Sequence, residues 1–143
     1  MDWGLLAVGS ALAFAGIGSA IGTGSAGMAA AGAWKRCYQQ NKPAPFLLLV
    51  FVGAPLTQTI YGFLLMNQII AAAEANGDPA LMLGFGVIGG IAIGMSALFQ
   101  GRAGAVASDA LADTGKGFVN FLLALGIIES VALLVMAFGL ISL

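Results

Sequence analysis

The sequence contains no histidine, a single cysteine and few charged residues. Only 8% of its 143 residues are charged, whereas a soluble domain has about 25%, so an ordinary soluble fold is excluded. The net charge of −1 leaves no basic surface to neutralise phosphates, and no nucleic acid partner is expected. With only Cys37 available, an internal disulfide is impossible and a cysteine-based metal site is not expected.

Apolar residues take the place of the missing charge and form 60% of the chain. A helix needs about 20 apolar residues to cross a bilayer, and four stretches are long enough: approximately 4–34, 46–73, 80–112 and 117–142. The breaks between them contain prolines or the turn-forming sequences NGDP and DTGKG. Because lipid offers the backbone no hydrogen-bond partners, each stretch should be a helix. The sequence predicts an all-α membrane protein with four transmembrane helices in a single membrane domain, 1–143.

The few charged residues predict the orientation in the membrane. All five cations lie in or near the first and third breaks: Lys35, Arg36, Lys42, Arg102 and Lys116. The second break and the termini carry only acids, which are Asp2, Glu74 and Asp78. Since cationic loops stay in the cytoplasm, we expect both termini on the outer side. The start, MDWGLL, lacks the cationic region of a cleaved signal peptide, so the first helix should remain in the mature protein.

An internal repeat relates the two halves of the chain. The sequence SAIGTGSAGMAAAG aligns with SALFQGRAGAVASD in the second half, and the region around Gln58 aligns with that around Glu129. We therefore expect a duplicated helical hairpin, 1–75 and 76–143, with both copies oriented the same way. This differs from the inverted repeats of many alternating-access transporters.

Glycines recur at four-residue spacing in the first and third stretches: Gly18, Gly22, Gly86, Gly90 and Gly94. This spacing places small residues on one helix face, where two backbones can approach closely. One interpretation is tight packing inside a single four-helix bundle. The other, which we favour, is the inner wall of a narrow ring, in which case leucine at position 22 or 90 would break an oligomer.

Glu129 is the only acidic residue in the middle of a predicted helix. A carboxylate there is costly unless it is paired or neutral, and such residues commonly mark ion pathways. A simpler interpretation is a neutral acid that ties two helices together by a hydrogen bond. We favour the ion pathway because several polar residues lie at matching depth.

Those polar residues lie on the second and third stretches. One face of the second carries four candidate positions, at i, i+3, i+4 and i+7: Ala54, Thr57, Gln58 and Tyr61. Pro55 lies in the same turn and cannot donate a backbone hydrogen bond, so it loosens the helix beside these side chains. Gln100 belongs to the third stretch. Gln58, Gln100 and Glu129 all lie about 18 Å from the expected cytoplasmic ends of their helices.

This set of residues favours sodium over a proton as the bound ion. Hard cations prefer oxygen ligands, which carboxylate, amide and hydroxyl groups and a backbone carbonyl would supply. A proton needs only the carboxylate and a few hydrogen bonds. The number of oxygens around Glu129 exceeds that need, but a proton remains the alternative.

Three motifs, PLTQTIYGF (55–63), FQGRAGAVA (99–107) and IIES (127–130), resemble the V-type ATPase proteolipid family, especially its sodium-translocating bacterial form. The resemblance covers essentially the whole chain. It implies a homo-oligomeric rotor ring in the lipid of a bacterial plasma membrane, turning against a stator membrane subunit. Central stalk subunits would connect the ring to a soluble head that hydrolyses ATP. The chain itself would not be an enzyme, in agreement with its lack of a phosphate-binding P-loop.

The resemblance also implies a role for each site residue. Glu129 would be the ion-binding carboxylate, and the oxygen ligands would be Thr57, Gln58, Gln100 and the backbone carbonyl of Ala54. Tyr61 would donate a hydrogen bond to Glu129 and close the site. Leu56, Thr59 and Val131 depart from the residues usual in this family, which affects packing more than the choice of ion.

Two alternatives from other classes remain open. A small four-helix cation-coupled multidrug exporter would have this size, but its essential acid lies in the first helix, where this chain has none. A structural or pore-forming bundle would carry no ion, which disagrees with the polar residues around Glu129.

Overall fold

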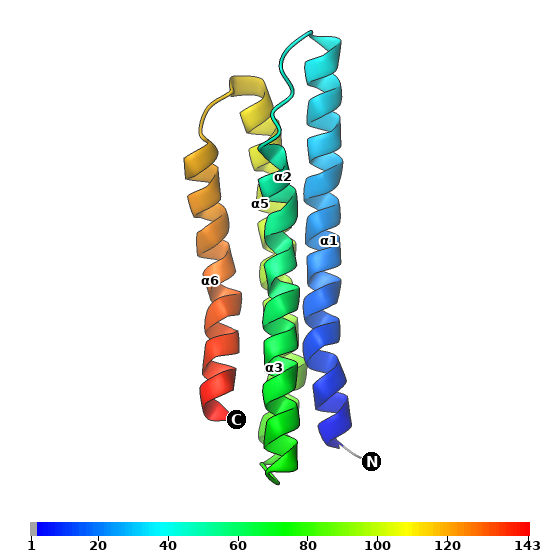
Figure 1. Ribbon diagram of the computed structural model, residues 1–143, viewed down its shortest axis with the longest axis vertical. Helices are drawn as coiled ribbons and strands as arrows, with labels where there is room; N and C mark the ends of the chain where they lie inside the picture. Colours follow the sequence, from blue (N-terminus) through cyan, green and yellow to red (C-terminus); the bar gives the residue numbers. More distant parts are fainter. Residues whose placement is uncertain (1–2) are drawn as a thin grey trace.

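Four long helical segments make up residues 3–143, the part of the chain that the computed structural model describes, and no strand occurs among them (Figure 1). The first segment is α1 (Trp3–Gln39) and the last is α6 (Phe118–Ser142). The second consists of α2 (Leu48–Gly53), a 3₁₀ turn η1 (Ala54–Leu56) and α3 (Thr57–Glu74), and the third of α4 (Pro79–Leu83), a π-helical turn η2 (Gly84–Gly89) and α5 (Gly90–Thr114). All four are long and apolar enough to cross a membrane, which confirms the expected fold class.

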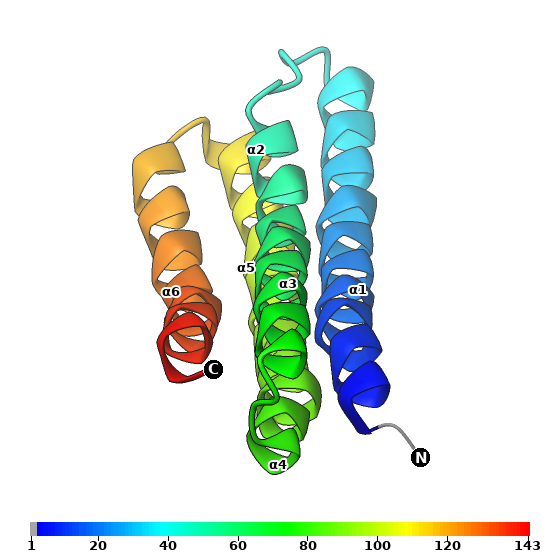
Figure 2. The same cartoon turned by 60° about the horizontal axis from the view of Figure 1, so that its bottom comes forward.

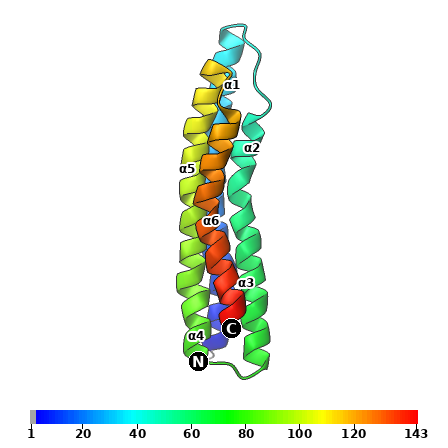
Figure 3. The ribbon, with the colours of Figure 1, turned by 90° about the vertical axis from the view of Figure 1, so that its left-hand side faces the viewer.

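The segments form an elongated bundle whose loops lie at two ends. Figure 1 shows the α1–α2 and α5–α6 loops at the top, whereas the α3–α4 loop lies at the bottom with the start of α1 and the end of α6. In the tilted view of Figure 2, α5 runs behind α2 and α3, between α6 and α1. Figure 3 shows α6 beside both α5 and α3. The cationic loops therefore share one end, as the charge pattern predicts; Asp2 lies outside the described residues.

Two irregular turns interrupt the second and third segments. Pro55 lies in η1 because it cannot donate to the carbonyl of Phe51 and its ring clashes with that group. The position of Pro55 in the sequence predicts this loosening. The π-helical turn η2, with the sequence GFGVIG, is not predicted from the sequence. Its glycines lower the cost of leaving regular helix geometry.

The closest backbone contacts lie between α1 and α5, which run in the same direction. A Cβ atom on Gly18 would overlap the backbone of Gly94, and one on Gly101 would overlap the backbone of Gly22. A Cβ on Gly90 would lie 2.9 Å from the carbonyl oxygen of Ser10. The repeated glycines therefore pack two helices of the same chain, which is the first of the two interpretations above. Their spacing does not require a ring wall.

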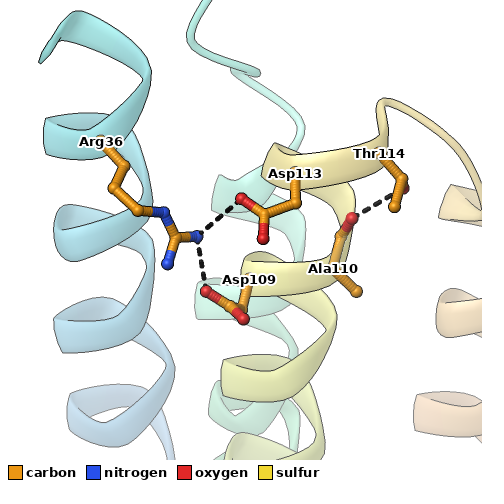
Figure 4. Close-up of polar contacts among 5 residues, drawn as sticks. All are labelled: Arg36, Asp109, Ala110, Asp113 and Thr114. Carbon is orange, nitrogen blue, oxygen red and sulfur yellow. Dashed lines mark hydrogen bonds and ion pairs between the residues drawn. The ribbon is translucent and has the colours of Figure 1, made fainter. Parts of the chain in front are cut away.

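The loop end, comprising residues 35–47 and 109–117, differs from the expectation because α1 continues to Gln39. Lys35, Arg36 and Cys37 are therefore helical, and Cys37 is buried. The Arg36 guanidinium pairs with the carboxylates of Asp109 and Asp113 on α5, as Figure 4 shows. These side chains are about half exposed, so water screens the pairs and they contribute little to stability.

The glycine contacts generate a test of packing. Gly94→Ala places a methyl group against the carbonyl of Phe14 and should lower the free energy of unfolding of the detergent-solubilised protein by about 1–3 kcal/mol. Gly24→Ala is the matched control, because a Cβ there meets no atom within 4 Å in the chain. Equal loss in both variants, measured by circular dichroism during denaturation, would contradict the packing described here.

Candidate ion-binding site

The Glu129 carboxylate receives hydrogen bonds from two other helices. The Tyr61 hydroxyl on α3 donates to Oε1 at 2.7 Å, and the Gln100 Nε2 on α5 donates to Oε2 at 3.1 Å. Glu129 itself lies in the middle of α6 and is half-buried. Each carboxylate oxygen therefore has one donor, which stabilises a charge that an apolar environment disfavours.

Behind Gln100 lies a second, fully buried amide. Gln58 and Gln100 are both 0% exposed, and Gln58 Nε2 donates to Gln100 Oε1 at 2.8 Å. Gln100 Nε2 also donates to the carbonyl oxygen of Leu125 on α6 at 3.0 Å. The two amides thus connect α3, α5 and α6 through a continuous series of hydrogen bonds.

Three oxygen atoms gather on the other side of Gln58. The Thr57 hydroxyl lies 2.9 Å from the Ala54 carbonyl oxygen and 3.1 Å from Gln58 Oε1. The backbone N–H of Thr57 also donates to the Ala54 carbonyl, which closes the 3₁₀ turn around Pro55. The irregular turn therefore brings a backbone carbonyl to the polar side chains.

The structure thus brings together all the residues singled out in the sequence, but in two groups. Tyr61 and Gln100 contact Glu129 directly. The second group consists of Ala54, Thr57 and Gln58, and Gln58 connects it to the acid through Gln100. Helical periodicity predicts the shared face but not this separation.

Ser96 belongs to the same network and is not among the residues predicted from the sequence. Its hydroxyl donates to the Ile128 carbonyl oxygen on α6 at 2.8 Å, and Gln58 Nε2 lies 3.5 Å from Ser96 Oγ. Ser96 is 6% exposed. The sequence does contain one indication of this role. Ser96 lies four residues before Gln100, which puts both side chains on one face of α5.

Arg102 does not lie near the third loop, contrary to the expectation from the sequence. It is within α5, well before the end of that helix at Thr114, and its guanidinium stacks over the Phe99 ring at 5.5 Å from the centroid. The other four cations all lie at the loop end, so the asymmetry of charge between the two ends is kept. They are Lys35, Arg36, Lys42 and Lys116.

The donor set suits a small monovalent cation. Among the described residues, no three His, Cys, Asp or Glu side chains cluster as a metal site. The site offers one carboxylate with neutral amide, hydroxyl and carbonyl oxygens. Such a set matches sodium or, through the carboxylate alone, a proton, whereas a transition metal would prefer imidazole or thiolate ligands.

A four-helix membrane bundle with a single mid-helix carboxylate held by amide and phenol groups has the features of a cation-carrying membrane protein. Residues 83–142 match the family of the ATP synthase C subunits. Over 116 residues the chain is 34% identical to the A-type ATP synthase subunit K of Methanocaldococcus jannaschii, and the match covers 80% of this chain and 50% of that protein. The chain thus spans about half the length of this relative. The chain is therefore similar to the proteolipid subunits of V- and A-type ATPases, as the motifs indicated.

Tyr61→Phe tests the contact that covers Glu129. Losing the hydroxyl removes the group that hydrogen-bonds to Oε1 and covers it, so labelling of the Glu129 carboxyl by a carbodiimide, which reacts with the neutral acid, should become at least about threefold faster. Tyr38→Phe is the control, since Tyr38 is exposed on the last turns of α1. Unchanged labelling of Tyr61→Phe by mass spectrometry would show that this hydrogen bond does not control the acid.

Proposed function

We propose that the chain is the ion-carrying subunit of a V/A-type ATPase rotor ring and that its ion is sodium. The observation that carries the proposal is the hydrogen-bonded Glu129 carboxylate in the middle of α6, with further oxygen atoms one amide away. Similarity to the ATP synthase C subunits over residues 83–142, and to an A-type ATP synthase subunit K, supports the rotor assignment.

In this function, ring rotation alternates Glu129 between two environments. Against lipid and neighbouring subunits the carboxylate holds the ion; against a stator membrane subunit it releases the ion. Central stalk subunits transmit the rotation to or from a soluble head, where partner subunits carry out the ATP chemistry. The chain contributes no catalytic residue. Homo-oligomerisation into a ring supplies the repeated sites that continuous rotation requires.

The oxygen atoms near Glu129 support sodium as the carried ion. We propose Glu129, Thr57, Gln58, Gln100 and the carbonyl of Ala54 as the ligands, with Tyr61 closing the site. The Ala54 and Thr57 oxygens lie 2.9 Å apart, which is close enough for both to contact one ion. Sodium bound by neutral oxygens and one carboxylate would neutralise the only charge in the middle of α6.

A proton is the second candidate, because the groups that contact Glu129 directly do not form an oxygen cage. They are the Tyr61 hydroxyl and the Gln100 amide nitrogen. A hydroxyl can also accept, so Tyr61 could take a hydrogen bond from a protonated Glu129, and a proton carrier needs no further ligand. An exporter fits less well, since α1 contains no acidic residue from Trp3 to Gln39.

Sodium protection of Glu129 separates the two ions. Bound sodium keeps Glu129 ionised and should slow carbodiimide labelling, more strongly as pH rises and fewer protons compete. Glu129→Gln should abolish transport, because a neutral amide has no charge with which to bind the ion or to pair with the stator after the ion has left. Gln58→Ala and Gln100→Ala should leave the acid reactive but require at least about threefold more sodium for protection. Absence of protection by millimolar sodium at every pH would assign the proton instead.

Orientation is the second test. We propose that the loop end faces the cytoplasm of a bacterial plasma membrane and that both termini face outward, on the charge pattern and the family resemblance. Buried Cys37 is a poor probe, so single cysteines belong at exposed positions in a Cys37→Ala background. An impermeant maleimide added to intact cells should label Glu74→Cys but not Lys42→Cys. Labelling of Lys42→Cys alone would reverse the orientation.

A further inference from the structure

We propose that Ser96 is a positioning residue that fixes the direction of the Gln58 side-chain amide and thereby sets the sodium affinity of the site. This inference rests on the proposed function, since it concerns the affinity of the same site. Ser96 itself is not proposed as a ligand.

A backbone carbonyl of α6 determines which way the side-chain amides of the network point. A carbonyl oxygen can only accept, so Gln100 must present Nε2 to the Leu125 carbonyl, 3.0 Å away. The same nitrogen donates to Glu129 Oε2, so both of its hydrogens are used. Turning the Gln100 amide would set its oxygen against two other oxygens. Gln100 Oε1 therefore faces Gln58.

Ser96 links Gln58 to a second backbone carbonyl of α6, that of Ile128. The hydroxyl proton of Ser96 is committed to the Ile128 carbonyl at 2.8 Å, which leaves Oγ as an acceptor. Gln58 thus faces two acceptors, Gln100 Oε1 at 2.8 Å and Ser96 Oγ at 3.5 Å. Both favour its nitrogen on that side, and its oxygen turns toward the Thr57 hydroxyl.

This arrangement opposes the binding of a cation at Glu129. The Gln58 nitrogen covers Gln100 Oε1, so the two amide oxygens cannot contact one ion beside the carboxylate until the Gln58 amide turns. Turning gives up the contacts to Gln100 and Ser96 and carries Gln58 Oε1 away from the Thr57 hydroxyl, which keeps the Ala54 carbonyl as its partner. The ion replaces the first contact, because it binds Gln100 Oε1 itself, but it does not replace the second. The Ser96 acceptor therefore stabilises the ion-free state alone.

Removing the Ser96 oxygen should consequently strengthen sodium binding. In Ser96→Ala, half-maximal protection of Glu129 against carbodiimide should need roughly two- to fivefold less sodium at fixed pH, because one weak hydrogen bond no longer opposes the turn. Ser96→Thr keeps the acceptor and should match the unmodified protein. Ser130→Ala is the matched control: its hydroxyl lies beside Glu129 in sequence but bonds to the Ile127 carbonyl of its own helix at 2.7 Å.

The direction of the shift separates this role from a structural one. If Ser96 only held α5 against α6, its loss would loosen the site, and more sodium would be needed. An equal or higher half-protecting concentration in Ser96→Ala would therefore overturn the inference while leaving the sodium assignment intact. No protection of the unmodified protein would overturn both. If Ser96→Ala does not assemble, Ser96→Cys carries the same prediction, since a thiol is a weak acceptor of similar size.

Discussion

A carboxylate in the middle of a membrane helix requires hydrogen-bond donors, and the arrangement of this bundle supplies them to Glu129. Neither donor comes from α6 itself: Tyr61 reaches it from α3 and Gln100 from α5. Both helices must therefore lie beside α6 at the same depth. An unpaired charge at this position would cost more than a typical surface interaction contributes, so the donors are a condition of insertion as well as of function.

Two backbone features hold the donors in place. Close contact between the glycines of α1 and α5 fixes α5, so that the amide of Gln100 meets α6. The 3₁₀ turn at Pro55 shifts the start of α3 and directs the Ala54 carbonyl toward Thr57. Glycine permits the first feature by having no Cβ, and proline causes the second by lacking a donor. Both features lie in segments that the sequence marks clearly.

The sequence predicts the four helices, the central acid and its polar neighbours because hydropathy, helical period and the cost of buried charge are local or one-dimensional properties. It does not predict Ser96, whose partner is a backbone carbonyl on another helix, and any residue at position 128 would present the same carbonyl. It also misses the pairing of Arg36 with Asp109 and Asp113, because the expected end of the first helix lies before Arg36. The direction of the amide network is equally hidden, because a glutamine can present either end. The ligand roles of these residues remain predictions.

Equilibrium binding of radioactive sodium to the purified, detergent-solubilised oligomer tests the central claim most directly. If Glu129 and its neighbouring oxygens form one sodium site, the protein should bind one ion per chain, and Glu129→Gln should bind none. Binding should fall as pH decreases, because protons then occupy the carboxylate. If the unmodified protein binds no sodium, or if Glu129→Gln binds as much sodium as the unmodified protein, the account is contradicted.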